Sequence, residues 1–77
     1  MTLRIIGLNH HNASLDYREK LAFSHEEIQS CLKDLIASDE IKEAVILSTC
    51  NRTEFYLQAN EEGEEYTKTW LKKNKNI

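Results

Sequence analysis

Apolar and polar positions alternate with different periods along the chain, and the period predicts the type of each element. Residues 2–8 (TLRIIGL) are rich in β-branched and aliphatic side chains and end at the polar cluster NHHNAS, which is typical of a first strand. Residues 43–48 (EAVILS) form a continuous apolar run, which predicts a central strand buried on both faces. Residues 53–59 alternate strictly, so we expect a strand with one buried face. The side chains expected on that face are Thr53, Phe55, Leu57 and Ala59.

A helix is predicted after Ser24, where apolar residues recur every three or four positions. Ser24 and Glu27 have the spacing of a capping box, and Phe23 is placed to pack on Ile28 as a hydrophobic staple. The apolar positions fall on one stripe of such a helix, which we expect to pack on a sheet. These positions are Ile28, Cys31, Leu32, Leu35 and Ile36.

Two further segments have helical character. In residues 14–23 (SLDYREKLAF), Ser14 can cap a short helix. From Glu61 onward acidic residues precede basic ones, which matches the helix dipole at both ends. Glu64 and Lys68 add an ion pair at i, i+4 spacing. We therefore expect a second and a third helix in these places.

The resulting order of elements, β-α-α-β-β-α, predicts an α+β fold. It is the ferredoxin-like split β-α-β pattern with the final strand missing from this chain. The missing strand would leave an exposed sheet edge, through which we expect the chain to self-associate. The length of 77 residues suits one small domain, and no linker divides it. We therefore expect residues 1–77 to be one unit and a fragment of a longer domain.

Composition narrows the classes of function. Ten Lys and Arg against thirteen Asp and Glu give a net charge of −3, which disfavours a module that binds RNA through its phosphates. No apolar run approaches the roughly 18 residues that span a bilayer, and the polar start lacks a signal-peptide core. Two cysteines are too few for a small disulfide-stabilised secreted domain. We expect a cytoplasmic protein with reduced thiols and no membrane partner.

The segment LSTCNRTEFY (residues 47–56) places Cys50 in a turn that follows an apolar strand. A nearby cation or converging backbone N–H groups would lower the pKa of that thiol and increase its thiolate fraction. Arg52 is the nearest cation in the sequence, but it also suits a bound carboxylate or a solvated strand end. Spacing alone leaves Cys50 open as a packing residue or a nucleophile. Cys31, within the apolar helix stripe, is interpreted as structural.

The histidines do not have the spacing of a metal site. Neither a C-x-x-C nor an H-x-x-x-H pair occurs, and His25 falls in the exposed first turn of the capped helix. His10 and His11 end the first strand and would face the Cys50 turn if that strand neighbours the second one. A histidine there would act as a base, orient a substrate or remain a solvated loop residue. We expect no metal.

Two segments of the chain resemble the N-terminal signatures of the glutamyl-tRNA reductase family. They are GLNHHNASLDYREKLAF (residues 7–23) and LSTCNRTEFY, at the separation the family has. The resemblance spans essentially the whole chain but only the N-terminal part of the family's catalytic domain. It implies an oxidoreductase that converts glutamyl-tRNA(Glu) to glutamate-1-semialdehyde with NADPH, through a cysteine thioester, in tetrapyrrole (porphyrin, heme) biosynthesis.

The resemblance also assigns site residues. Cys50 occupies the family's nucleophile position. Thr49 and Arg52 match positions that contact the glutamyl substrate, and Arg52 would pair with a carboxylate. Asn51 would shape the turn, because Asn tolerates the left-handed conformation. His10 matches an Asn-His element near the pocket and would have a supporting role.

The resemblance further implies parts of the enzyme that these residues lack. The family's later histidine, its NADPH-binding Rossmann domain and the helical domain that makes it a homodimer all correspond to sequence beyond Ile77. No glycine-rich dinucleotide fingerprint occurs here. We therefore expect no cofactor and no reductase activity in this fragment alone. A different class of function stays open: a small interaction or redox-sensing module with a structural or oxidisable Cys50.

Overall fold

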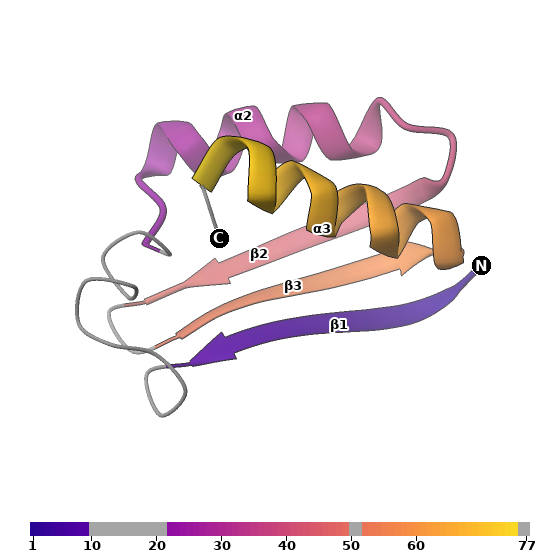
Figure 1. The fold of residues 1–77 in the computed structure, drawn as a ribbon, viewed down its shortest axis with the longest axis horizontal. Helices are drawn as coiled ribbons and strands as arrows, with labels where there is room; N and C mark the ends of the chain where they lie inside the picture. Colours follow the sequence, from indigo (N-terminus) through magenta and orange to yellow (C-terminus); the bar gives the residue numbers. More distant parts are fainter. Residues whose placement is uncertain (10–21, 50–51, 76–77) are drawn as a thin grey trace.

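The computed structural model describes residues 1–9, 22–49 and 52–75 of the chain. The elements are β1 (Thr2–Asn9), α2 (His25–Ile36), β2 (Ile41–Ser48), β3 (Arg52–Ala59) and α3 (Glu61–Lys75). Within the described residues the sheet has three antiparallel strands in the order β1-β3-β2, and both helices lie on the same face of it (Figure 1). The α+β class and the split β-α-β pattern predicted from sequence are confirmed. The short helix expected over 14–23 lies outside the described residues except for Ala22 and Phe23, which are not helical.

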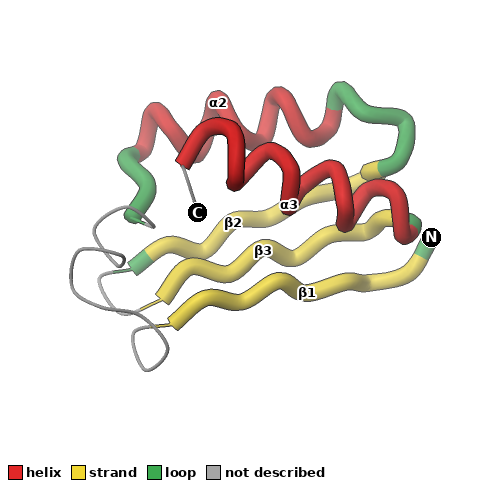
Figure 2. The backbone as a smooth tube through the Cα atoms, viewed as in Figure 1, coloured by secondary structure: helices red, strands yellow, loops and turns green. Residues whose placement is uncertain are grey.

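The central strand is β3, and the prediction that the apolar run 43–48 forms a buried central strand is wrong. β2 is an edge strand, in which Val45 is 60% exposed and Leu47 39% exposed. The helices cover only one face of the sheet (Figure 2), so only alternate residues of the run can be buried. Leu3 and Ile5 of β1 are exposed on the same uncovered face, which we call the open face.

The core lies between the sheet and the helical layer. The alternation predicted for β3 is confirmed, because all four of its inward side chains are buried. The buried apolar residues are Cys31, Leu35, Ile41, Phe55, Leu57, Ala59 and Leu71. Ile36 was expected in this set but is largely exposed. Successive helix residues point about 100° apart, so Leu35, expected on the same stripe, faces the core while Ile36 lies at the edge of the stripe.

The start of α2 agrees with its predicted capping signals. Glu27 N–H donates to the Ser24 hydroxyl and Ser24 N–H donates to the Glu27 carboxylate, both at 3.1 Å. Phe23, just before the cap, packs edge-on against Phe55 with ring centroids 5.8 Å apart and stacks on Trp70 at 6.1 Å. The ring of Phe23 therefore joins the helix start to the core. Its contact with Ile28 stays a prediction.

α3 is positioned by a close approach to the sheet. Asn60 caps the helix by accepting a bond from Gly63 N–H at 2.9 Å. A Cβ at Gly63 would lie 2.9 Å from the Ala59 Cβ, so only glycine permits this packing distance. The ion pair predicted between Glu64 and Lys68 is present at 3.6 Å.

Among the described residues, no helix is both long and apolar enough to span a membrane.

Candidate functional site

The turn between β2 and β3 is closed by two residues of the predicted site. Thr49 N–H donates to the Arg52 carbonyl at 2.8 Å, and Arg52 N–H donates to the Thr49 hydroxyl at 3.2 Å. Thr49 and Arg52, which flank the turn in the sequence, are therefore brought together. Cys50 and Asn51 stand between them in the sequence and lie outside the described residues.

The described residues on either side of the segment 10–21 lie at this same end of the sheet. Asn9, the last residue of β1, is the register partner of Arg52. At the other end, Phe23 N–H donates to the Ser48 hydroxyl at 3.2 Å. β1 neighbours β3 rather than β2, so the end of β1 lies beside the start of β3 (Figure 1). His10 follows Asn9 but lies outside the described residues. The described ends of the two sequence signatures therefore converge.

Arg52 has a carboxylate partner on the open face of the sheet. Its Nε lies 3.1 Å from Oε1 of Glu54, because residues two apart in a strand share a face. The Arg52 side chain is 56% exposed, so this pair contributes at most about 1 kcal/mol. The main effect of this ion pair is to orient the Arg52 guanidinium, because Glu54 contacts one edge of it. A hydrogen bond to Glu54, together with burial, raises the pKa of the neighbouring Tyr56.

On the opposite, helix-covered face, two hydroxyl groups lie directly beneath the turn. The Ser48 Oγ and Thr53 Oγ1 atoms are 3.2 Å apart, and Thr53 is only 2% exposed. Ser48 was not among the site residues predicted from the sequence. The signal that could have found it is its place at the end of a strand, on the inward face and opposite another hydroxyl residue.

Cys31 is a structural core residue, as the sequence predicts. It is fully buried between α2 and the sheet. Burial, with a smaller contribution from Asp34, raises the pKa of its thiol to about 12. His25 is exposed in the first turn of α2, where its ring lies 3.2 Å from the Gln29 amide. Across the described ranges, no cluster of His, Cys, Asp and Glu side chains could hold a metal ion.

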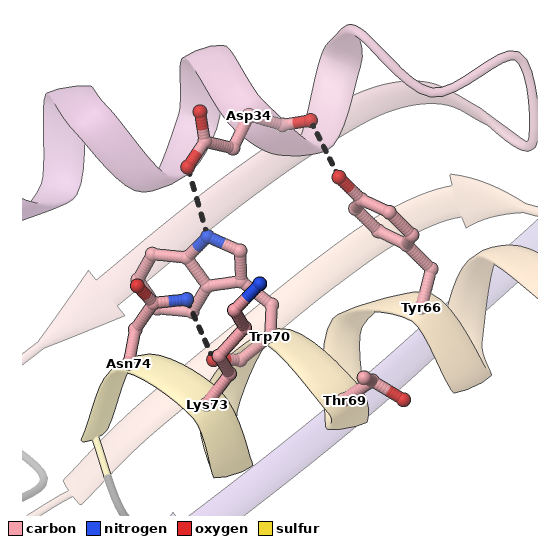
Figure 3. A pocket seen from close by; sticks show the side chains of 6 residues that line it. All are labelled: Asp34, Tyr66, Thr69, Trp70, Lys73 and Asn74. Carbon is pink, nitrogen blue, oxygen red and sulfur yellow. Dashed lines mark hydrogen bonds between the residues drawn. The ribbon is translucent and has the colours of Figure 1, made fainter.

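A pocket of about 310 Å³ lies in the helical layer, between α2 and α3 (Figure 3). The Trp70 indole N–H donates to the Asp34 carboxylate at 3.0 Å, and the Tyr66 hydroxyl donates to the Asp34 carbonyl at 3.5 Å. Asp34 thus accepts both ring donors of the pocket. These contacts connect α3 to α2, so we assign the pocket a structural role. The turn between β2 and β3 remains the candidate site.

The fold and the site define a two-layer α+β domain with its candidate chemistry on a hairpin turn at one end of the sheet. A family model described as "Glutamyl-tRNAGlu reductase, N-terminal domain" matches residues 6–77. The chain belongs to this family.

Named relatives agree with the family match. The chain is 46% identical over 77 residues to the glutamyl-tRNA reductase of Saccharophagus degradans, covering 100% of this chain and 18% of that protein. It is 49% identical over 72 residues to the glutamyl-tRNA reductase of Aliivibrio fischeri, covering 92% and 17%. For the glutamyl-tRNA reductase of Nitrosomonas europaea, identity is 55% over 56 residues, covering 73% and 14%. The chain therefore spans less than a fifth of the length of these relatives.

Proposed function

We propose that this chain is the N-terminal part of the catalytic domain of a glutamyl-tRNA reductase. The full-length enzyme would reduce glutamyl-tRNA(Glu) to glutamate-1-semialdehyde with NADPH, in the tetrapyrrole pathway. The observation that carries the proposal is that the described residues of both signatures converge at one end of the sheet, where Thr49 and Arg52, which flank Cys50 in the sequence, are bonded to each other. The family match spans both signatures.

In this proposal Cys50 is the nucleophile. Its thiolate attacks the carbonyl carbon of the glutamyl ester, a C–S bond forms, and the ester C–O bond breaks. The tRNA leaves as its terminal ribose hydroxyl after taking up a proton, and the glutamyl group stays on Cys50 as a thioester. Asn51 shapes the turn that presents the thiol, and His10 has a supporting role beside it.

Arg52 is proposed to bind the carboxylate of the glutamyl group. Its Nε faces Glu54, and the terminal guanidinium nitrogens, which have no ion-pair partner among the described residues, would donate to a second carboxylate. The Thr49 hydroxyl, which also bonds the Arg52 backbone, would contact the same substrate. A bound glutamyl group would in this way be held over the turn by both of its flanking residues.

The residues of this chain do not fit an NADPH site. The chain has two glycines, Gly7 within β1 and Gly63 within α3, so neither belongs to a glycine-rich loop between a strand and a helix. The reducing step and the homodimer contact would therefore belong to other parts of the longer enzyme. With a net charge of −3, the chain would also leave most of the tRNA contact to those parts.

We expect the isolated chain to be cytoplasmic, inactive as a reductase and prone to self-association. β1 and β2 are the edges of the three-stranded sheet. An unpaired edge strand offers N–H and C=O groups to another chain. Light scattering during size-exclusion chromatography would test this: mass that rises with concentration supports it, and a monomer at all concentrations contradicts it.

The proposed nucleophile is tested by Cys50→Ser in the full-length protein. We expect no glutamate-1-semialdehyde from glutamyl-tRNA and NADPH, because an alcohol replaces the thiolate. Cys31→Ala is the matched control, since it removes the other thiol from a buried structural position. That variant should keep its activity at a temperature where it is folded. Retained activity in Cys50→Ser would contradict the proposal.

A further inference from the structure

Ser48 joins three separate segments of the chain through one hydroxyl group. It is the last residue of β2 and lies on the helix-covered face. Its Oγ accepts the Phe23 N–H at 3.2 Å and lies 3.2 Å from the Thr53 hydroxyl at the start of β3. The bond to Phe23 links residues 25 apart in the sequence. Ser48 therefore connects the segment before α2 to both strands of the hairpin.

The Phe23 end of this connection is itself held in place. Lys75, in the last turn of α3, donates to the Ala22 carbonyl at 2.9 Å, and its ammonium lies 4.5 Å from the Phe23 ring centroid. The same ring packs on Phe55 and Trp70. The Phe23 N–H that donates to Ser48 therefore belongs to a backbone held by other contacts. The bond can thus set the distance between Phe23 and the β2–β3 hairpin.

We infer that Ser48 is a positioning residue of the site: its hydroxyl sets the placement of Thr49 and Arg52, which flank the turn, relative to Phe23. The inference rests on the proposed function, in which that turn carries the nucleophile Cys50. Without the hydroxyl, Phe23 N–H loses this acceptor, and the turn and Phe23 can move apart. A misplacement of about 1 Å between reacting groups can lower a rate on the order of 100-fold.

The test uses the full-length enzyme with Ser48→Ala and the matched variant Ser38→Ala. Ser38 also accepts one backbone bond, from Glu40 N–H at 3.2 Å, but it lies in the turn between α2 and β2. Rates are measured at a temperature where circular dichroism shows every variant folded. We expect kcat of Ser48→Ala to fall about tenfold or more with KM changed much less. Ser38→Ala should keep its kcat, and Ser48→Thr, which retains the hydroxyl, should restore it.

Wild-type kcat in a folded Ser48→Ala variant would overturn the inference, and so would an equal loss in Ser38→Ala. If Ser48→Ala does not fold, Ser48→Cys decides the matter. A thiol has nearly the same shape but is a weak hydrogen-bond acceptor, so a lowered kcat supports the inference and a wild-type kcat overturns it. The Cys50→Ser variant separates the two proposals. Activity in Cys50→Ser would reject the proposed function, whereas an inactive Cys50→Ser with a fully active Ser48→Ala rejects only the role of Ser48.

Discussion

Replacing Lys75 by Met should destabilise the chain although Lys75 lies near the end of its last helix. The Lys75 side chain is only 10% exposed and its ammonium lies 2.6 Å from the Glu27 carboxylate. It also donates to the Ala22 carbonyl and lies over the Phe23 ring. Methionine keeps much of the aliphatic stem and removes all three polar contacts. The substitution therefore isolates the contribution of the charge.

The expected cost follows from the environment of each contact. A hydrogen bond that involves a charged group contributes about 1.5–3 kcal/mol, and an exposed cation–π contact contributes about 0.5–1 kcal/mol. The Glu27 side chain is 47% exposed, so solvent screens the ion pair, and burying the ammonium costs part of the gain. We expect Lys75→Met to lower the free energy of unfolding by about 1–2 kcal/mol. Lys72→Met, an exposed control on the same helix, should change it by no more than about 0.5 kcal/mol.

The pH dependence gives this prediction a second test. The hydrogen bond from Lys75, followed by that from Ser24, lowers the pKa of Glu27 below its ordinary value of 4.5. A carboxyl group with a lowered folded pKa stabilises the fold above its unfolded pKa, and the contribution is lost as the pH falls through the folded pKa. Urea unfolding between pH 7 and pH 3 should therefore show a smaller acid loss in Lys75→Met than in the wild type. Equal stability of Lys75→Met and Lys72→Met, with identical pH curves, would show that the Lys75 ammonium does not stabilise the fold.

Three further predictions concern the open face and the core. Glu54→Gln should lower the pKa of Tyr56 towards its ordinary value, because Glu54 is the main cause of the raised value; ultraviolet titration measures it, and an unchanged pKa contradicts it. Leu57→Ala, in the core, should cost about 2–5 kcal/mol in urea unfolding, whereas Leu3→Ala on the open face should stay within about 0.5 kcal/mol. Similar costs for both would disprove the assigned faces. The Cys31 thiol, with its pKa raised to about 12, should resist alkylation at pH 8 until the chain unfolds, and rapid native labelling would contradict its burial.

Local signals in the sequence predicted the elements better than their arrangement. The capping box at Ser24 and the alternation of β3 depend on residues within a few positions of each other, and both are confirmed. The prediction of β2 as the central strand was wrong, because an apolar run does not specify which strand pairs with a neighbour on both sides. Such pairing depends on contacts between distant segments, and in this fold β3 lies between the other two strands.

The candidate site likewise combines features set by neighbouring residues with features set by distant segments. Thr49 and Arg52 could be placed together because they flank one short turn. The place of Ser48 at a strand end was a signal in the sequence, but the role inferred for it depends on the Phe23 N–H group from another segment, which the sequence does not place. The resemblance carried by residues 47–56 indicated the family without any of this geometry. The arrangement of the sheet then explains how the two signatures reach one end of the domain.

The central claim, that Cys50 carries the glutamyl group, is tested most directly by trapping the acylated enzyme. The full-length protein is mixed with glutamyl-tRNA labelled in its glutamyl group, without NADPH, and quenched in acid, where a thioester survives. Mass spectrometry of the digested protein then locates the label. We expect one labelled peptide, with the glutamyl group on Cys50 and released by hydroxylamine. A label on any other residue, or an active enzyme without a labelled Cys50, would contradict it.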